Sequence, residues 1–132
     1  MSYRAEISVA GKLMDILSCE FEFNRDIDSK GRASSRVYGG QFTVQVESTA
    51  NTMLLEQMLN NQYLPFDGEV IFYKGDEDDA EMKKLEFKKS YMIHFNEKLD
   101  ILGKNPMLIE LTITAEELIM GPATYNGGWP VA

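Results

Sequence analysis

The sequence has 132 residues, 44% of them apolar and 11% aromatic, which is enough for one domain with a sizeable core and excludes a disordered tail. The 13 basic and 21 acidic residues give a net charge of −8, and because an acidic surface repels phosphate, we expect no nucleic-acid partner. The single cysteine, Cys19, excludes an internal disulfide and is typical of a reducing compartment. We therefore expect one domain spanning residues 1–132.

No segment has the pattern of a leader or a membrane anchor. Residues 1–6 include Arg4 and Glu6 and no apolar run of the kind that signal peptides contain. No window approaches the ~18 apolar residues that a membrane-spanning helix needs. We expect no membrane insertion, and if the protein leaves the cell, its export route cannot be a cleaved leader.

Alternating apolar and polar residues predict strands in the first third of the chain. Residues 3–9 form the first, and the turn Ala10-Gly11-Lys12 leads to the second, residues 13–23. In the second strand one face carries Leu13, Leu17, Cys19, Phe21 and Phe23, and the other face begins with Met14 and Ile16. Burial of the first half of this strand on both sides therefore stays open. This pattern predicts that Cys19 is a buried and unreactive core thiol. A third strand covers residues 42–46.

The segment Asn24–Gly40 separates the second and third strands and contains 17 mostly polar residues. Hairpin loops usually contain about two to five residues, so a longer one in a compact domain is either functional or disordered. Gly39-Gly40 predicts a bend or a bulge at its end. The mixed charges favour pairing with another protein surface, and the alternative is a loop without fixed structure.

Residues 48–62 have the only convincing helical pattern, and the strands resume after it. The helix has an apolar stripe made of Leu54, Leu55, Met58 and Leu59, with Thr49 or Asn51 as its cap. Strands are expected at residues 69–74, 85–95 and 107–114, the last continuing to residue 120. In the strand 85–95 one face carries Leu85, Phe87, Tyr91, Ile93 and Phe95, with an interruption at Lys89. His94 then lies on the polar face, as a surface or interface residue.

Six to eight predicted strands and one helix indicate a mainly β (α+β) fold. We expect a small antiparallel β-barrel, or two packed sheets, with one flanking α-helix. A Gly-rich tail leads to Trp129, and an aromatic residue in such a tail is expected to dock on its own chain or on a neighbour.

The sequence lacks a convincing catalytic or ligand-binding motif. Two acidic segments imitate calcium loops, but the one at Asp26 has Lys30 at position 5 and Val37 at position 12. The second, at Asp76, has Glu81 where glycine is needed. We therefore expect no enzyme activity, no cofactor and no metal site.

Seven short segments stand in a characteristic order: Gly31-Arg32-Ala33-Ser34-Ser35, Gly39-Gly40, Val46-Glu47-Ser48, Phe72-Tyr73-Lys74, Lys84-Leu85-Glu86-Phe87, Asn105-Pro106-Met107 and Glu110-Leu111-Thr112-Ile113-Thr114-Ala115. In this order and spacing, from Arg4 to Trp129, the chain resembles the haemolysin-coregulated protein family (Hcp, TssD), the tube proteins of type VI secretion systems. It is most similar to the divergent small-subunit branch with a Gly-Arg-x-Ser segment. Here x is Ala33, where relatives often have proline, so we expect a less rigid loop.

The resemblance implies a structural protein whose homo-hexameric rings stack into a hollow tube. A contractile sheath on a baseplate propels such a tube, tipped by the spike protein VgrG, and secreted effectors can travel in its lumen. The protein would be cytoplasmic during assembly and then secreted or injected without a signal peptide.

The resemblance also implies roles for particular residues. The long loop would contact neighbouring rings through Asp26, Asp28, Lys30, Arg32 and Ser34. The helix stripe would pack on the core or at the ring interface. The main alternative is a free-standing small β-barrel that binds an apolar ligand or serves as an adaptor. Oligomer size separates the two.

Overall fold

The computed structural model describes residues 3–74, 80–104 and 106–128. In chain order its elements are β1 (Tyr3–Val9), β2 (Lys12–Phe21), β3 (Gln41–Glu47), α1 (Met53–Leu59), β4 (Phe66–Lys74), β5 (Ala80–Leu99), β6 (Met107–Met120) and β7 (Ala123–Asn126).

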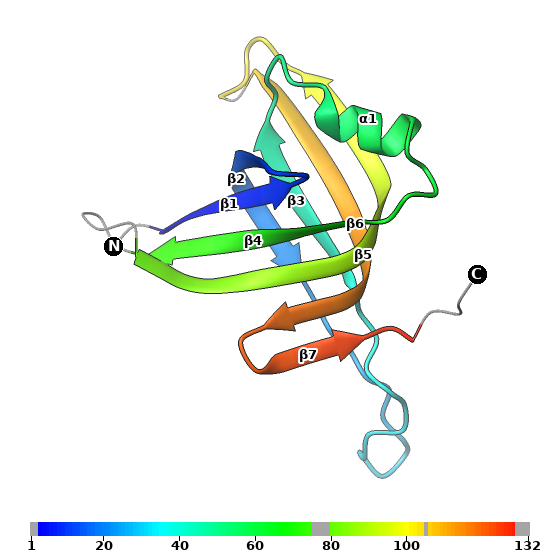
Figure 1. The fold of residues 1–132 in the computed structure, drawn as a ribbon. Helices are drawn as coiled ribbons and strands as arrows, with labels where there is room; N and C mark the ends of the chain where they lie inside the picture. The colour runs from blue at the N-terminus through cyan, green and yellow to red at the C-terminus, as the bar shows by residue number, and fades with distance from the viewer. Residues whose placement is uncertain (1–2, 75–79, 105, 129–132) are drawn as a thin grey trace.

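The strands form one antiparallel sheet that closes on itself (Figure 1). Neighbouring strands pair in the order β3-β2-β1-β4-β5-β6-β7, and β3 also pairs with β6. Strands β1 to β6 therefore make a closed barrel, which β7 extends at β6, while α1 packs against β5. Closure satisfies the backbone groups that an open edge would expose. The predicted mainly β barrel with one flanking helix is confirmed.

The barrel interior is filled by side chains from every strand from β1 to β6. Its fully buried large members are Phe42, Phe87, Ile7, Leu85, Leu111, Ile113, Val9, Val44, Val46 and Val70. The Phe42 and Phe87 rings lie 4.9 Å apart between centroids. Each such side chain stabilises the fold by about 1.5–3 kcal/mol through its burial. The interior is thus a packed core.

The predicted turn between the first two strands is confirmed. Ala10 and Gly11 have φ angles of +51° and +80° and connect the paired residues Val9 and Lys12. Two consecutive positive φ angles are typical of the type I′ turn, whose twist matches that of the flanking strands.

Two strands change their inward face at irregularities, and here the predicted faces are right in one part of the strand and wrong in another. In β2 a bulge between Ile16 and Ser18 interrupts the register. Before it Met14 and Ile16 face the core, whereas Leu13 and Leu17 are exposed. After it Cys19 and Phe21 pack against the core, because one extra residue moves the following side chains to the other face.

In β5 the change occurs at Lys89, whose φ is +51° and whose N–H donates to Asp67 Oδ1 at 3.0 Å. Leu85 and Phe87 point inward as predicted. Beyond Lys89, however, the buried residues are Ser90 and Met92, while Ile93 is exposed and Tyr91 half-buried. A second register shift between Met92 and His94 turns Phe95 towards the core again.

The helix is shorter than predicted and the sheet is longer. α1 covers Met53–Leu59 only, and its N-cap residue Thr52 makes no side-chain cap bond. Asn51, a predicted cap, instead accepts a hydrogen bond from the N–H of Met53 at 2.9 Å, just before the first turn. Strand β7 lies in the segment that the sequence indicated as a Gly-rich tail, because the turn at Gly121–Pro122 folds the chain back onto β6.

Candidate assembly interface

Residues 24–40, which we call the arm, extend away from the barrel between β2 and β3 (Figure 1). Its two sides pair at Asn24 with Tyr38 and at Ile27 with Ala33. The Ser34 N–H donates to the Asp26 carbonyl at 2.8 Å, which adds a further hydrogen bond between the two sides. The arm is therefore an ordered hairpin-like structure, and the alternative of a loop without fixed structure is wrong.

The Asp28 carboxylate organises the tip of the arm. Its Oδ1 accepts the backbone N–H groups of Lys30 and Arg32, both at 2.9 Å. Gly31 completes the turn with a φ of +81°, a conformation that glycine adopts without strain. The Arg32 guanidinium lies 3.6 Å from Asp28 Oδ2. The predicted contact residue Asp28 thus has a structural role at the tip.

Asp26 is also engaged within the arm. Its carboxylate accepts a hydrogen bond from the Tyr38 hydroxyl, and its N–H donates to Ser35 Oγ at 2.8 Å. Asp26 is exposed, as are Lys30, Arg32 and Ser34, and 70% of the Arg32 side chain is accessible. Of the five predicted contact residues, two shape the arm and three present side chains to the outside.

Ile27 is a feature of the arm that the sequence did not single out. It lies between Asp26 and Asp28, and 70% of its surface is exposed. A β-branched apolar residue at an exposed tip suits a protein contact. The signal in the sequence was a β-branched apolar residue within residues 24–32, where every other residue is polar or glycine.

The root of the arm is fixed to the β6–β7 hairpin. Arg36 Nη2 donates to the carbonyl of Asn126 at 2.8 Å. Gly40 has a φ of +84° and its carbonyl accepts the N–H of Ala115 at 2.6 Å. A Cβ on Gly40 would lie 2.9 Å from the Tyr125 ring, so this position requires glycine. The bend predicted at Gly39-Gly40 is therefore confirmed.

The predicted helix stripe divides between the core and the surface. Leu54 is buried and Met58 packs against the barrel core. Leu55 is half-buried, whereas 58% of Leu59 is exposed. The structure thus assigns Leu54 and Met58 to core packing and leaves Leu59 accessible. Trp129, the predicted docking residue of the tail, lies outside the described residues.

The two residues with the most reactive side chains have ordinary surroundings. Cys19 is half-buried against the core, and burial raises the pKa of its thiol to about 11, which makes it a poor nucleophile. His94 lies on the exposed polar face, as predicted, with Nε2 3.9 Å from Glu110 Oε1. Within residues 3–74, 80–104 and 106–128, no group of three acidic, His or Cys side chains is arranged to hold a metal ion.

The model of the Hcp family, described as "Hemolysin coregulated protein Hcp (TssD)", matches residues 1–130. The chain belongs to the Hcp (TssD) family. It is a structural tube subunit. Among the helices that the structure describes, none is long and apolar enough to cross a membrane.

Solved Hcp structures have the same fold. Hcp1 from Flavobacterium johnsoniae is 32% identical with a TM-score of 0.87, and the match covers 93% of this chain and 98% of that one. Hcp1 from Salmonella typhimurium is 10% identical with a TM-score of 0.74 and coverages of 96% and 95%. No curated protein sequence matches the chain.

A chain from another contractile machine also has this fold. The match is to the sheath-tube complex of an extracellular contractile injection system (PVC) in its extended state. Its TM-score is 0.62 at 15% identity, and it covers 93% of this chain and 91% of that one. At this identity the similarity concerns the fold alone.

Proposed function

We propose that this Hcp-family subunit forms six-membered rings, and that the arm joins each ring to the next in a stacked tube. The ordered arm is the observation that carries this proposal. It extends from the barrel and is held in shape by its own hydrogen bonds, so its exposed tip is available to another subunit. The contact between rings would be made by Lys30, Arg32 and Ser34, together with Ile27.

Six copies of one chain in a ring share a heterologous interface that closes on itself. The exposed side of α1, including Leu59, is a candidate part of this interface. The filled barrel core supports a structural role, since the interior holds side chains where a ligand-binding barrel would have a cavity.

The remaining partners follow from family membership as proposals. We infer that a contractile sheath on a baseplate surrounds and propels the tube, with VgrG at its tip and secreted effectors as cargo. Assembly would take place in the cytoplasm, and the contractile machine would supply the exit route without a signal peptide. Such a tube needs no catalytic centre, so we propose that the protein is not an enzyme.

A free-standing ligand-binding barrel, the alternative from the sequence, conflicts with membership of the Hcp family, and one observation alone speaks for it. An apolar groove lies beside the root of the arm and is large enough for a small molecule. The oligomeric state separates the two functions, because a ligand carrier would be monomeric or dimeric.

Light scattering on size-fractionated protein, followed by negative-stain imaging of the main peak, tests the proposal. We expect the mass of six subunits and open ring views. Because rings can depend on concentration, the measurement should extend to high protein concentration and salt. A monomer that persists there would contradict the ring and favour the ligand carrier.

A further inference from the structure

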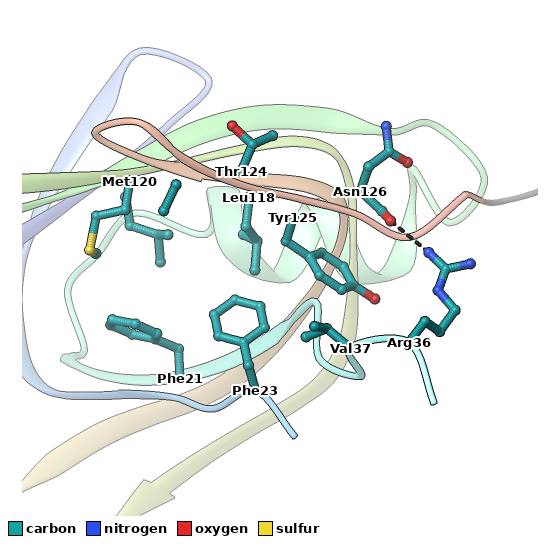
Figure 2. A pocket seen from close by; sticks show the side chains of 11 residues that line it. Phe21, Phe23, Arg36, Val37, Leu118, Met120, Thr124, Tyr125 and Asn126 are labelled. Carbon is teal, nitrogen blue, oxygen red and sulfur yellow. Dashed lines mark hydrogen bonds between the residues drawn. The ribbon is translucent and has the colours of Figure 1, made fainter. Parts of the chain in front are cut away.

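The groove beside the arm lies between the arm root and the β6–β7 hairpin (Figure 2). It has a volume of about 490 Å³, and its apolar walls are formed by Phe21, Phe23, Val37, Leu118, Met120 and Tyr125. Phe23 remains 39% exposed and Val37 38% exposed. Exposed apolar surface of this kind favours the binding of another apolar group, because burying both surfaces lowers the free energy.

The last described residues run along the rim of this groove. Asn126 lines it, and the Arg36 guanidinium, also in the lining, donates to the Asn126 carbonyl. The Gly128 N–H donates to Asn126 Oδ1 at 2.8 Å. A Cβ on Gly128 would lie 3.5 Å from Arg36 Nη1, so the backbone of Gly128 lies close to this guanidinium. The chain therefore leaves the described part at the edge of the groove.

The sequence that follows has the chemistry that the groove would accept. Trp129, Pro130, Val131 and Ala132 are apolar. Adjacent Cα atoms are about 3.8 Å apart, which keeps the Trp129 side chain within reach of the rim. A tryptophan buries about 150–250 Å² on docking, and a guanidinium such as that of Arg36 can lie over its ring.

We propose that Trp129 docks into this groove of its own chain and covers the root of the arm. The covalent connection favours the same chain over a second copy, because a tethered group loses no translational freedom on docking. Gly127-Gly128 provides the backbone freedom for the turn, and Gly128 already has a φ of +65°. The docked indole would join the arm to the β6–β7 hairpin. This inference goes beyond the proposed function and does not require rings to form.

Trp129 is the only tryptophan of the chain, so its fluorescence reports on this site alone. We expect blue-shifted emission from the native protein and several-fold weaker quenching by acrylamide than in the urea-unfolded chain. Val37→Glu should shift the emission wavelength and the acrylamide quenching towards the values of the unfolded chain, because it places a charge in the groove. Phe23→Ala, which removes one wall without adding charge, should act in the same direction.

Ile101→Glu is the matched control. It also replaces an exposed β-branched residue with an acid, since 77% of Ile101 is accessible, but it lies in the β5–β6 turn and does not line the groove. Its emission should match that of the wild type, and circular dichroism should show all three variants folded. Native emission like that of the unfolded chain, or variants without effect on the emission, would overturn the proposal.

Mixing two variants tests whether the tail stays on its own chain. Trp129→Phe has an intact groove and no tryptophan, whereas Val37→Glu has the tryptophan and an altered groove. If tails dock on their own chains, assembling the two together leaves the emission red-shifted. A return of the blue shift would show that the tail docks on a neighbouring subunit and would overturn docking within one chain.

Discussion

Single residues determine where this chain turns and what it exposes. Asp28 stands out because one carboxylate oxygen holds two N–H groups of the arm tip. The same oxygen would be needed by a bound calcium ion, so the structure gives a physical reason to regard this acidic segment as a turn. Arg32, four residues on, keeps its backbone bond to Asp28 whatever its side chain is.

We predict that Arg32→Glu weakens ring stacking and leaves the subunit folded. The Arg32–Asp28 ion pair is exposed and contributes at most about 1 kcal/mol, whereas reversing a charge at six tips per ring opposes every contact there. Negative-stain imaging should show rings with few tubes, and the thermal midpoint should change little. Lys88→Glu, the same charge reversal at an exposed residue of β5, is the control and should stack normally. An unfolded Arg32→Glu chain would instead assign Arg32 a structural role.

We also predict that Cys19 is nearly inert in the native protein. Burial raises its pKa from 9.0 to about 11, and only the thiolate reacts. At one neutral pH a thiol reagent should therefore modify the native chain about a hundredfold more slowly than the urea-unfolded chain. Similar rates in the two states would show that the thiol is accessible in the native protein.

At the scale of elements, the short helix depends on its packing for stability. Seven residues are too few for a helix to be stable by itself in water, and no side-chain cap supports its first turn. Leu54 and Met58 attach it to the barrel. Its neighbour β5 shows the same dependence on context, since Asp67 of β4 supports the unusual backbone at Lys89.

We predict that Leu54→Ala lowers the free energy of unfolding by about 2–5 kcal/mol, because it leaves a cavity between helix and barrel. Leu59→Ala, the same substitution five residues further on at a largely exposed residue, should cost less than about 0.5 kcal/mol. Urea unfolding of both variants measures the difference. Equal losses would show that the whole stripe is buried, in the subunit or in a ring.

At the scale of the whole molecule, the net charge opposes assembly. A net charge of −8 per subunit becomes −48 in a ring of six. Rings that stack must therefore place opposite charges locally, and the Lys30 and Arg32 side chains of the arm tip are suited to meet an acidic neighbour.

We predict that isolated rings stack poorly at low ionic strength and better as salt is added, because salt screens the repulsion between rings. Tube length measured by imaging across a salt series tests this. Long tubes at low salt and single rings at high salt would show that attraction between charges, not repulsion, dominates the contact.

Local sequence patterns determined much of this protein. Alternation in β1, β3 and β6 identified core residues such as Ile7, Val44 and Leu111, because side chains of a regular strand alternate strictly between faces. The Ala10-Gly11 turn and the Gly39-Gly40 bend were also predictable, since each depends on the conformations of two adjacent residues. The order of short segments was enough to indicate the Hcp family.

Only the tertiary structure decided the features that depend on distant contacts. The inward faces of β2 and β5 change at bulges, and a bulge is defined by the pairing of one strand with its neighbour. The arm is ordered because its two sides pair, and the groove exists because β7 folds back beside the arm root. Alternation along one strand does not contain these pairings, so the faces, the arm and the groove became visible only when the barrel closed.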